Sequence, residues 1–66
     1  MIKITLKAAR VNAGLTQAEA AKRLEISPST LIKWEQKPYL IPAYRQHSIS
    51  ELYNIPADSL IFLPNS

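Results

Sequence analysis

Apolar residues recur at helical spacing along the first part of the chain, and capping residues mark where each helix begins. Thr5 is a typical N-cap for a helix that we expect over residues 6–13. Leu6 and Ala9 share one side of that helix. Gly14 follows at a position where helices commonly end in a left-handed residue. The pattern therefore predicts a first short helix with one buried side.

Two further helices begin at equally clear signals. Thr16 and Glu19 have the spacing of a capping box and predict a helix over residues 17–24. A serine followed by Pro28 repeats the start signal, because proline at the first helical position loses no hydrogen bond. This second signal predicts a helix over residues 28–36.

The second half of the chain is punctuated by prolines. Two of them exclude a continuous helix over residues 37–42, so we expect a loop there that exposes three apolar side chains. Beyond it, the apolar spacing suits a fourth helix over residues 43–53, closed by Asn54. The segment ADSLIFL, residues 57–63, suggests a short fifth helix. The sequence thus predicts an all-α fold of four or five short helices in one domain, residues 1–66.

The connection between the second and third predicted helices is very short. Only residues 25–27 separate them, which is too little for antiparallel stacking, so the two axes must cross steeply. A tight helix-turn-helix over residues 17–35 follows. Such a crossing requires a small side chain at the closest approach, and Ala21 supplies it. Apolar residues that can form the core surround this alanine: Ala20, Leu24, Ile26, Leu31 and Trp34.

The segment GLTQAEAAKRLEISPSTLIKWE, residues 14–35, resembles the lambda-repressor-like helix-turn-helix family, also called Cro/C1 or XRE. Within that family, short Cro-like phage regulators are the most similar. The segments LKAARVNAG and ISELYNIPADSLIFL are similar, more loosely, to the family's first helix and closing segment. The resemblance implies the lambda-repressor-like fold and a sequence-specific, DNA-binding transcriptional regulator, with repression by operator occupancy as the expected mode.

The same resemblance implies which residues face DNA. The helix over residues 17–24 would lie across the backbone, and the helix over residues 28–36 would enter the major groove. Gln17 matches the family's phosphate-contacting glutamine, and it stands at a helix N-terminus, which attracts anions. Lys37 and Arg45 are cations near the expected backbone track. The candidate base readers lie on the outward side of the third helix: Ser27, Pro28, Ser29, Ile32 and Lys33.

Other positions match or depart from the family pattern in ways that affect structure. Arg10 and Glu35 match a pair that joins the first helix to the end of the third as a partly buried ion pair, so their implied role is structural. Glu25 stands where the family prefers glycine, and a left-handed turn there costs a non-glycine residue about 1 kcal/mol. Pro28 and Ser29 replace the long amides of relatives, which favours indirect readout of DNA shape.

Composition and charge narrow the classes of function. A net charge of +3 and a pI near 9.5 permit a polyanionic partner without requiring one. With no cysteine and His47 as the single histidine, the sequence offers no disulfide, metal cluster or catalytic triad. We therefore expect no enzymatic activity, no cofactor and no metal. The lack of cysteine and of an unbroken apolar stretch near the start favours a cytoplasmic protein without a signal peptide or membrane span.

The apolar residues of the 37–42 loop and of the closing segment exceed what so small a domain easily buries. We expect them to form a homodimer contact: Tyr39, Leu40, Ile41, Ile61 and Phe62. Two-fold symmetry would match a palindromic operator on double-stranded DNA, with no small-molecule effector. Two alternatives stay open: a protein-interaction module on the same scaffold and, with much less support, a nuclease.

Overall fold

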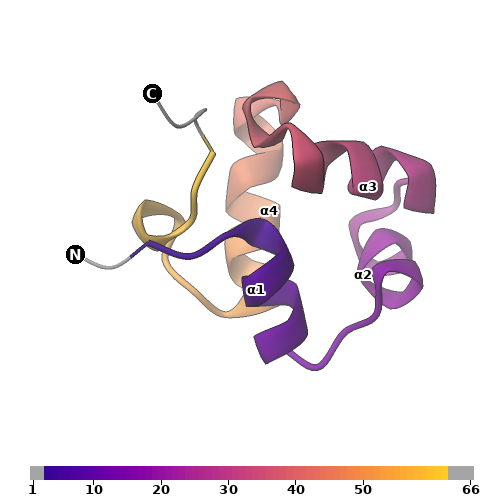
Figure 1. Cartoon of the computed structure of the whole chain (residues 1–66), viewed down its shortest axis with the longest axis horizontal. Helices are drawn as coiled ribbons and strands as arrows, with labels where there is room; N and C mark the ends of the chain where they lie inside the picture. Colours follow the sequence, from indigo (N-terminus) through magenta and orange to yellow (C-terminus); the bar gives the residue numbers. More distant parts are fainter. Residues whose placement is uncertain (1–2, 63–66) are drawn as a thin grey trace.

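The computed structural model describes residues 3–62, and over this range four α-helices are joined by short connections (Figure 1). The longest helix has 11 residues, and within the described part of the chain none is long and apolar enough to cross a bilayer. Two 3-10 turns, η1 and η2, follow the third and fourth helices. The elements in chain order are α1 (Leu6–Asn12), α2 (Gln17–Leu24), α3 (Pro28–Gln36), η1 (Pro38–Leu40), α4 (Ala43–Tyr53) and η2 (Ala57–Ser59).

Side-chain caps fix the starts of the first three helices. The Thr5 hydroxyl accepts a hydrogen bond from the first turn of α1 (3.1 Å). At α2 the Thr16 hydroxyl accepts from the Glu19 N–H (3.1 Å), and the Glu19 carboxylate accepts from the Thr16 N–H (2.9 Å), which completes the capping box. This backbone hydrogen bond, together with the Thr16 hydroxyl, lowers the pKa of Glu19. The Ser27 hydroxyl caps α3 in the same way (3.2 Å).

The core forms where α2 packs on α3 and where α4 packs on both α1 and α2. Ala20 and Ala21 are fully buried. The small side chain expected where α2 and α3 cross is therefore present, and it allows the two helix backbones to approach closely. Trp34 lies in the core, as its spacing from Leu31 predicts. The buried apolar residues are Leu6, Ala9, Ala20, Ala21, Leu24, Leu31, Trp34, Ile41, Ile49, Tyr53, Leu60 and Phe62.

The closing segment does not form the fifth helix expected over residues 57–63. Helical structure there is limited to the η2 turn, and residue 63 lies outside the described residues. Leu60 is extended and pairs with Ile4 in an isolated parallel bridge. The Ile4 N–H donates to the last carbonyl of η2 (2.8 Å), and the Ile61 N–H donates to the Ile4 carbonyl (3.1 Å). Pairing with the first segment thus satisfies backbone groups that a helix would have used.

Two residues expected on an exposed dimer surface lie inside the protomer instead. Ile41 is 4% exposed and Phe62 is 9% exposed. The loop expected over residues 37–42 contains η1, whose backbone hydrogen bonds turn the chain so that Ile41 faces the core. Tyr39 and Leu40, on the turn itself, stay 50% and 45% exposed. The expectation that the loop exposes three apolar side chains is therefore wrong for one of them.

Candidate nucleic-acid interface

The turn between α2 and α3 keeps left-handed geometry at Glu25, with φ 59° and ψ 42°. The N–H groups of Glu25 and Ile26 donate back to carbonyls of α2 (3.1 and 3.0 Å), which closes the helix end. A glutamate therefore occupies the position at which the family that the sequence resembles prefers glycine, at a strain cost of about 1 kcal/mol. The short connection between the two helices is preserved at this cost.

Helix α3 has a buried side and an exposed side. Leu31 and Trp34 point into the core and hold the helix against the rest of the molecule. Ser29 and Lys33 are exposed on the other side, and Ile32 is 40% exposed between them. An anchored helix with three exposed side chains on its outer face suits insertion into a groove of DNA.

The outer face of α3 continues onto η1 and forms one shallow groove. This groove combines cationic, amide, hydroxyl and apolar side chains, the kinds that contact phosphates and base edges. Its lining residues are Ser29, Ile32, Lys33, Gln36, Lys37 and Leu40. Gln36 was not among the candidates predicted from the sequence, and Leu40 was expected in the dimer contact, not among the DNA-contacting residues. Gln36 lies one helical turn beyond Ile32, so the helical spacing contained that signal, whereas η1 places Leu40 there.

The remaining candidates at the start of α3 have a structural task as well. The Ser27 hydroxyl lies 2.8 Å from the Thr30 hydroxyl and 3.1 Å from the Ser29 hydroxyl, in addition to its cap bond. Pro28 is exposed at the first helical position. Of the two serines, Ser29 is the less restrained, because the Ser27 hydroxyl also caps the helix.

The two cations expected near the DNA backbone differ in their surroundings. Lys37 ends α3 and is exposed beside the groove. Arg45, on α4, donates from Nη1 to the carbonyl of Leu24 at the last position of α2. Its guanidinium also lies 5.7 Å from the ring centroid of Tyr44. Arg45 therefore ties α4 to the helix-turn-helix, while Lys37 is free of such a contact in the described structure.

Gln17, the expected phosphate contact, is half-buried at the first position of α2. Its side-chain Nε2 donates to Glu35 Oε1 (3.0 Å). Glu35 Oε2 accepts from Arg10 Nε (2.7 Å), and the two charged side chains are only 6% and 8% exposed. Arg10 Nη1 also donates to the Leu15 carbonyl (2.9 Å). The structure thus contains the expected Arg10–Glu35 pair and adds Gln17 to it, a link that the sequence pattern did not predict.

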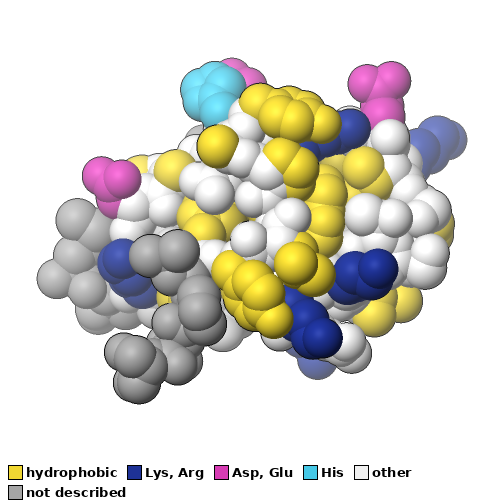
Figure 2. All heavy atoms as spheres, turned by 90° about the horizontal axis from the view of Figure 1, so that it is seen from above, with side chains coloured by type: hydrophobic (Ala, Val, Ile, Leu, Met, Phe, Trp, Pro, Cys, Tyr) yellow, Lys and Arg dark blue, Asp and Glu magenta, His cyan; other side chains and the backbone are white. Residues whose placement is uncertain are grey.

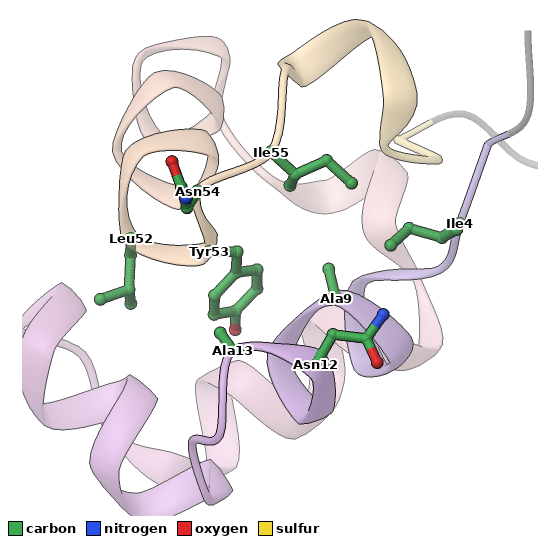
Figure 3. Close-up of a pocket in the computed structure, with 8 residues that line it drawn as sticks. All are labelled: Ile4, Ala9, Asn12, Ala13, Leu52, Tyr53, Asn54 and Ile55. Atoms are coloured by element: carbon green, nitrogen blue, oxygen red, sulfur yellow. The ribbon is translucent and has the colours of Figure 1, made fainter.

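A second hollow lies between α1 and α4 (Figure 3), with the ring of Tyr53 near its centre. Among the described residues, the buried Tyr53 hydroxyl has no hydrogen-bond partner. Burial, reinforced by the negative charge of Glu35 and opposed by Arg10, raises the pKa of Tyr53 to about 12. The residues that line the hollow are Ile4, Ala9, Asn12, Ala13, Leu52, Tyr53, Asn54 and Ile55.

The described residues hold no group of three or more histidine, cysteine or acidic side chains that could bind a metal ion. His47 lies on the surface of α4, with Nε2 3.5 Å from Glu51 Oε1, and both side chains are largely exposed. Neither residue lies in either of the two hollows described above.

Two short helices joined by a tight turn, with the second anchored by its inner side and exposed on its outer side, define a helix-turn-helix DNA-binding domain. A family model described as a helix-turn-helix domain matches residues 4–66. The chain belongs to this helix-turn-helix family, whose members bind DNA and are typically not enzymes. No curated protein and no solved structure matched the chain.

Proposed function

We propose that residues 1–66 act as one domain and as a sequence-specific transcriptional regulator, a Cro-like repressor that works by occupying its operator. The observation that carries the proposal is the groove on the outer face of α3. This groove brings apolar, amide, hydroxyl and cationic side chains, which can contact base edges and phosphates, together on one anchored helix. Occupancy suffices for repression, because a bound protein blocks access to the DNA beneath it.

The side chains of the groove suit contacts with both bases and phosphates. Ile32 can pack on a thymine methyl group, and Lys33 can reach guanine or a phosphate. The Gln36 amide can both donate to and accept from a base edge, as adenine requires. Gln17 would contact a phosphate from the start of α2, where backbone N–H groups also favour an anion.

A homodimer is part of the proposal, because the apolar surface and the modest charge both favour a second subunit. Three exposed apolar side chains, Tyr39, Leu40 and Tyr44, lie on η1 and at the start of α4. Seen from above in Figure 2, hydrophobic side chains form a band across the middle of the molecule, with Lys and Arg side chains beside it. A net charge of +3 anchors few phosphates per protomer, and two subunits double that number.

The test is selection of bound duplexes from a randomised DNA pool at moderate salt, followed by sequencing. We expect a palindrome with half-sites about 10 base pairs apart, the spacing that places two recognition helices in successive major grooves. A non-palindromic motif would support DNA recognition by a monomer. No enrichment would contradict the proposal and favour a protein-interaction module that docks through the exposed apolar side chains.

Matched variants test whether α3 reads the sequence. Ile32→Ala should change the preference between bases at one operator position, because it removes the contact with a methyl group. Lys33→Ala should weaken binding more than Lys7→Ala, a control that removes the same charge from an exposed position on α1. Equal effects of the two lysine variants would show that charge alone, and not the face of α3, determines affinity.

A further inference from the structure

We infer that Glu35 is a positioning residue for DNA binding: its carboxylate holds the Gln17 side chain in place for a phosphate contact. This inference rests on the proposed function and extends it to a residue that does not itself face the DNA groove. Glu35 is absent from the groove on the outer face of α3, and its side chain is only 6% exposed.

The geometry divides the two oxygens of Glu35 between two partners. Oε2 accepts from Arg10 Nε (2.7 Å), and Oε1 accepts from Gln17 Nε2 (3.0 Å). Arg10 in turn donates from Nη1 to the Leu15 carbonyl (2.9 Å), in the segment that leads into α2. One carboxylate therefore connects α1, the start of α2 and the last turn of α3. The position of Gln17 is thereby tied to the helix that carries the base readers.

The chemistry of the amide leaves Gln17 free to bind while it is held. An amide nitrogen carries two hydrogens, so donation of one to Glu35 leaves the other for a phosphate oxygen. A glutamine fixed in advance also loses less conformational freedom when it binds. Because the acceptor is a charged carboxylate, this bond is stronger than a neutral one. Glu35 can thus raise affinity without touching DNA.

The sign of one substitution separates positioning from simple electrostatics. Glu35→Gln removes a negative charge, and a protein that has lost a negative charge is attracted more strongly to DNA. Positioning predicts the opposite result, because a neutral amide holds Gln17 less firmly. A loss of DNA affinity in Glu35→Gln would therefore be the opposite of what the change in charge alone predicts.

A double-mutant cycle on DNA affinity provides the test, with the selected duplex as probe and circular dichroism verifying that each variant is folded. We expect Gln17→Ala and Glu35→Gln each to weaken binding by roughly two- to tenfold. The double variant should bind no more weakly than Gln17→Ala, because Glu35 acts through that glutamine. Additive losses, or unchanged or tighter binding by Glu35→Gln, would overturn the inference.

The failure of the proposed function is distinguishable from the failure of this inference. If the random pool yields no motif, DNA recognition itself fails. If a motif is recovered but Gln17→Ala binds it as tightly as the unmodified protein, the phosphate role and the positioning role are both wrong, while the regulator remains.

Nuclear magnetic resonance on the unmodified protein supplies a second measurement that does not depend on a variant being folded. The side-chain amide of Gln17 should show one proton that exchanges with solvent more slowly than the amide protons of Gln36, which is exposed. Equal exchange rates for the two glutamines would overturn the inference, because Gln17 would then not be held.

Discussion

Arg10 and Glu35 stand 25 positions apart in the sequence, yet the Arg10 Nε and Glu35 Oε2 atoms lie 2.7 Å apart between α1 and α3. Both side chains are less than one-tenth exposed, so each charge depends on the other for compensation. The pair is held further by the Leu15 carbonyl and by Gln17. Removing one partner leaves a buried charge without its counter-ion, which is the costly way to break such a pair.

We therefore predict that Arg10→Met lowers the free energy of unfolding by about 3–5 kcal/mol. A chain of this size has a total stability of roughly 3–10 kcal/mol, so the variant should lose about a third or more of it. Arg10→Met combined with Glu35→Leu should regain most of the loss, because no charge is then buried alone. Urea unfolding followed by circular dichroism measures both. A double variant as unstable as the single one would contradict this explanation.

The buried hydroxyl of Tyr53 gives a prediction in the opposite direction. It has no hydrogen-bond partner among the described residues, so folding removes it from water without compensation. Tyr53→Phe should therefore raise the free energy of unfolding at pH 7 by roughly 1 kcal/mol. Leu52→Ala, at the neighbouring half-buried position, is the control that lowers stability by loss of packing. A loss of stability in Tyr53→Phe would indicate that the hydroxyl is hydrogen-bonded in solution.

The raised pKa of Tyr53 predicts a specific loss of stability in alkali. The value rises from 10.0 to about 12 on folding, so the unfolded chain releases the phenol proton first. The free energy of unfolding therefore keeps its full value below pH 10. It falls progressively between pH 10 and about 12, where the folded form also ionises. The stability difference between Tyr53→Phe and the unmodified protein should widen across this interval. A constant difference would contradict the pKa shift.

Glu25 predicts a gain in stability from a single change in the turn. Its φ of 59° is a conformation that glycine adopts without strain. Glu25→Gly should raise the free energy of unfolding by about 1 kcal/mol. Gly14→Ala is the matched control, because Gly14 has φ 76° and an added Cβ would meet no atom within 4 Å. That variant should lose a similar amount through backbone strain alone.

Thermal unfolding of the two variants against the unmodified protein measures both effects. Opposite shifts of similar size would show that left-handed strain determines the stability of both turns. If Glu25→Gly proved neutral, the flexibility that glycine adds to the unfolded chain would offset the relief of strain.

The parts of the fold that could be predicted from the sequence are those determined by nearby residues. The starts of α1, α2 and α3 depend on caps at Thr5, Thr16 and Ser27, each of which bonds to a group three residues away. The closing segment could not be predicted in this way. Its extended form depends on pairing between Leu60 and Ile4, at the other end of the chain, and no local pattern contains that information.

The candidate site shows the same division. Helical spacing from Leu31 and Trp34 is enough to assign Ile32 and Lys33 to the outer face of α3. The hydrogen bond between Gln17 and Glu35 joins residues 18 positions apart, so it depends on how α2 packs against α3. The sequence was therefore enough to identify residues of the exposed face of α3, but not the contact that restrains Gln17 on α2.

Variants of the neighbouring residues Leu40 and Ile41 test stability and self-association separately. Ile41 is 4% exposed in the core, and Leu40 is 45% exposed on η1. Ile41→Ala should lower the free energy of unfolding by about 2–5 kcal/mol, because it leaves a cavity. Leu40→Ala should change stability by less than about 0.5 kcal/mol when the protein is dilute enough to be monomeric.

For self-association in the proposed homodimer, we expect Leu40→Ala to have the larger effect, because a symmetric interface contains Leu40 from both protomers. Leu40→Ala should weaken self-association by roughly tenfold or more, since two apolar side chains are shortened at once. Sedimentation equilibrium over a range of protein concentrations measures this, with Val11→Ala as the control at an exposed apolar position on α1. If both variants associate as tightly as the unmodified protein, the dimer contact lies elsewhere. If the unmodified protein is monomeric even at high concentration, only the operator can bring two protomers together.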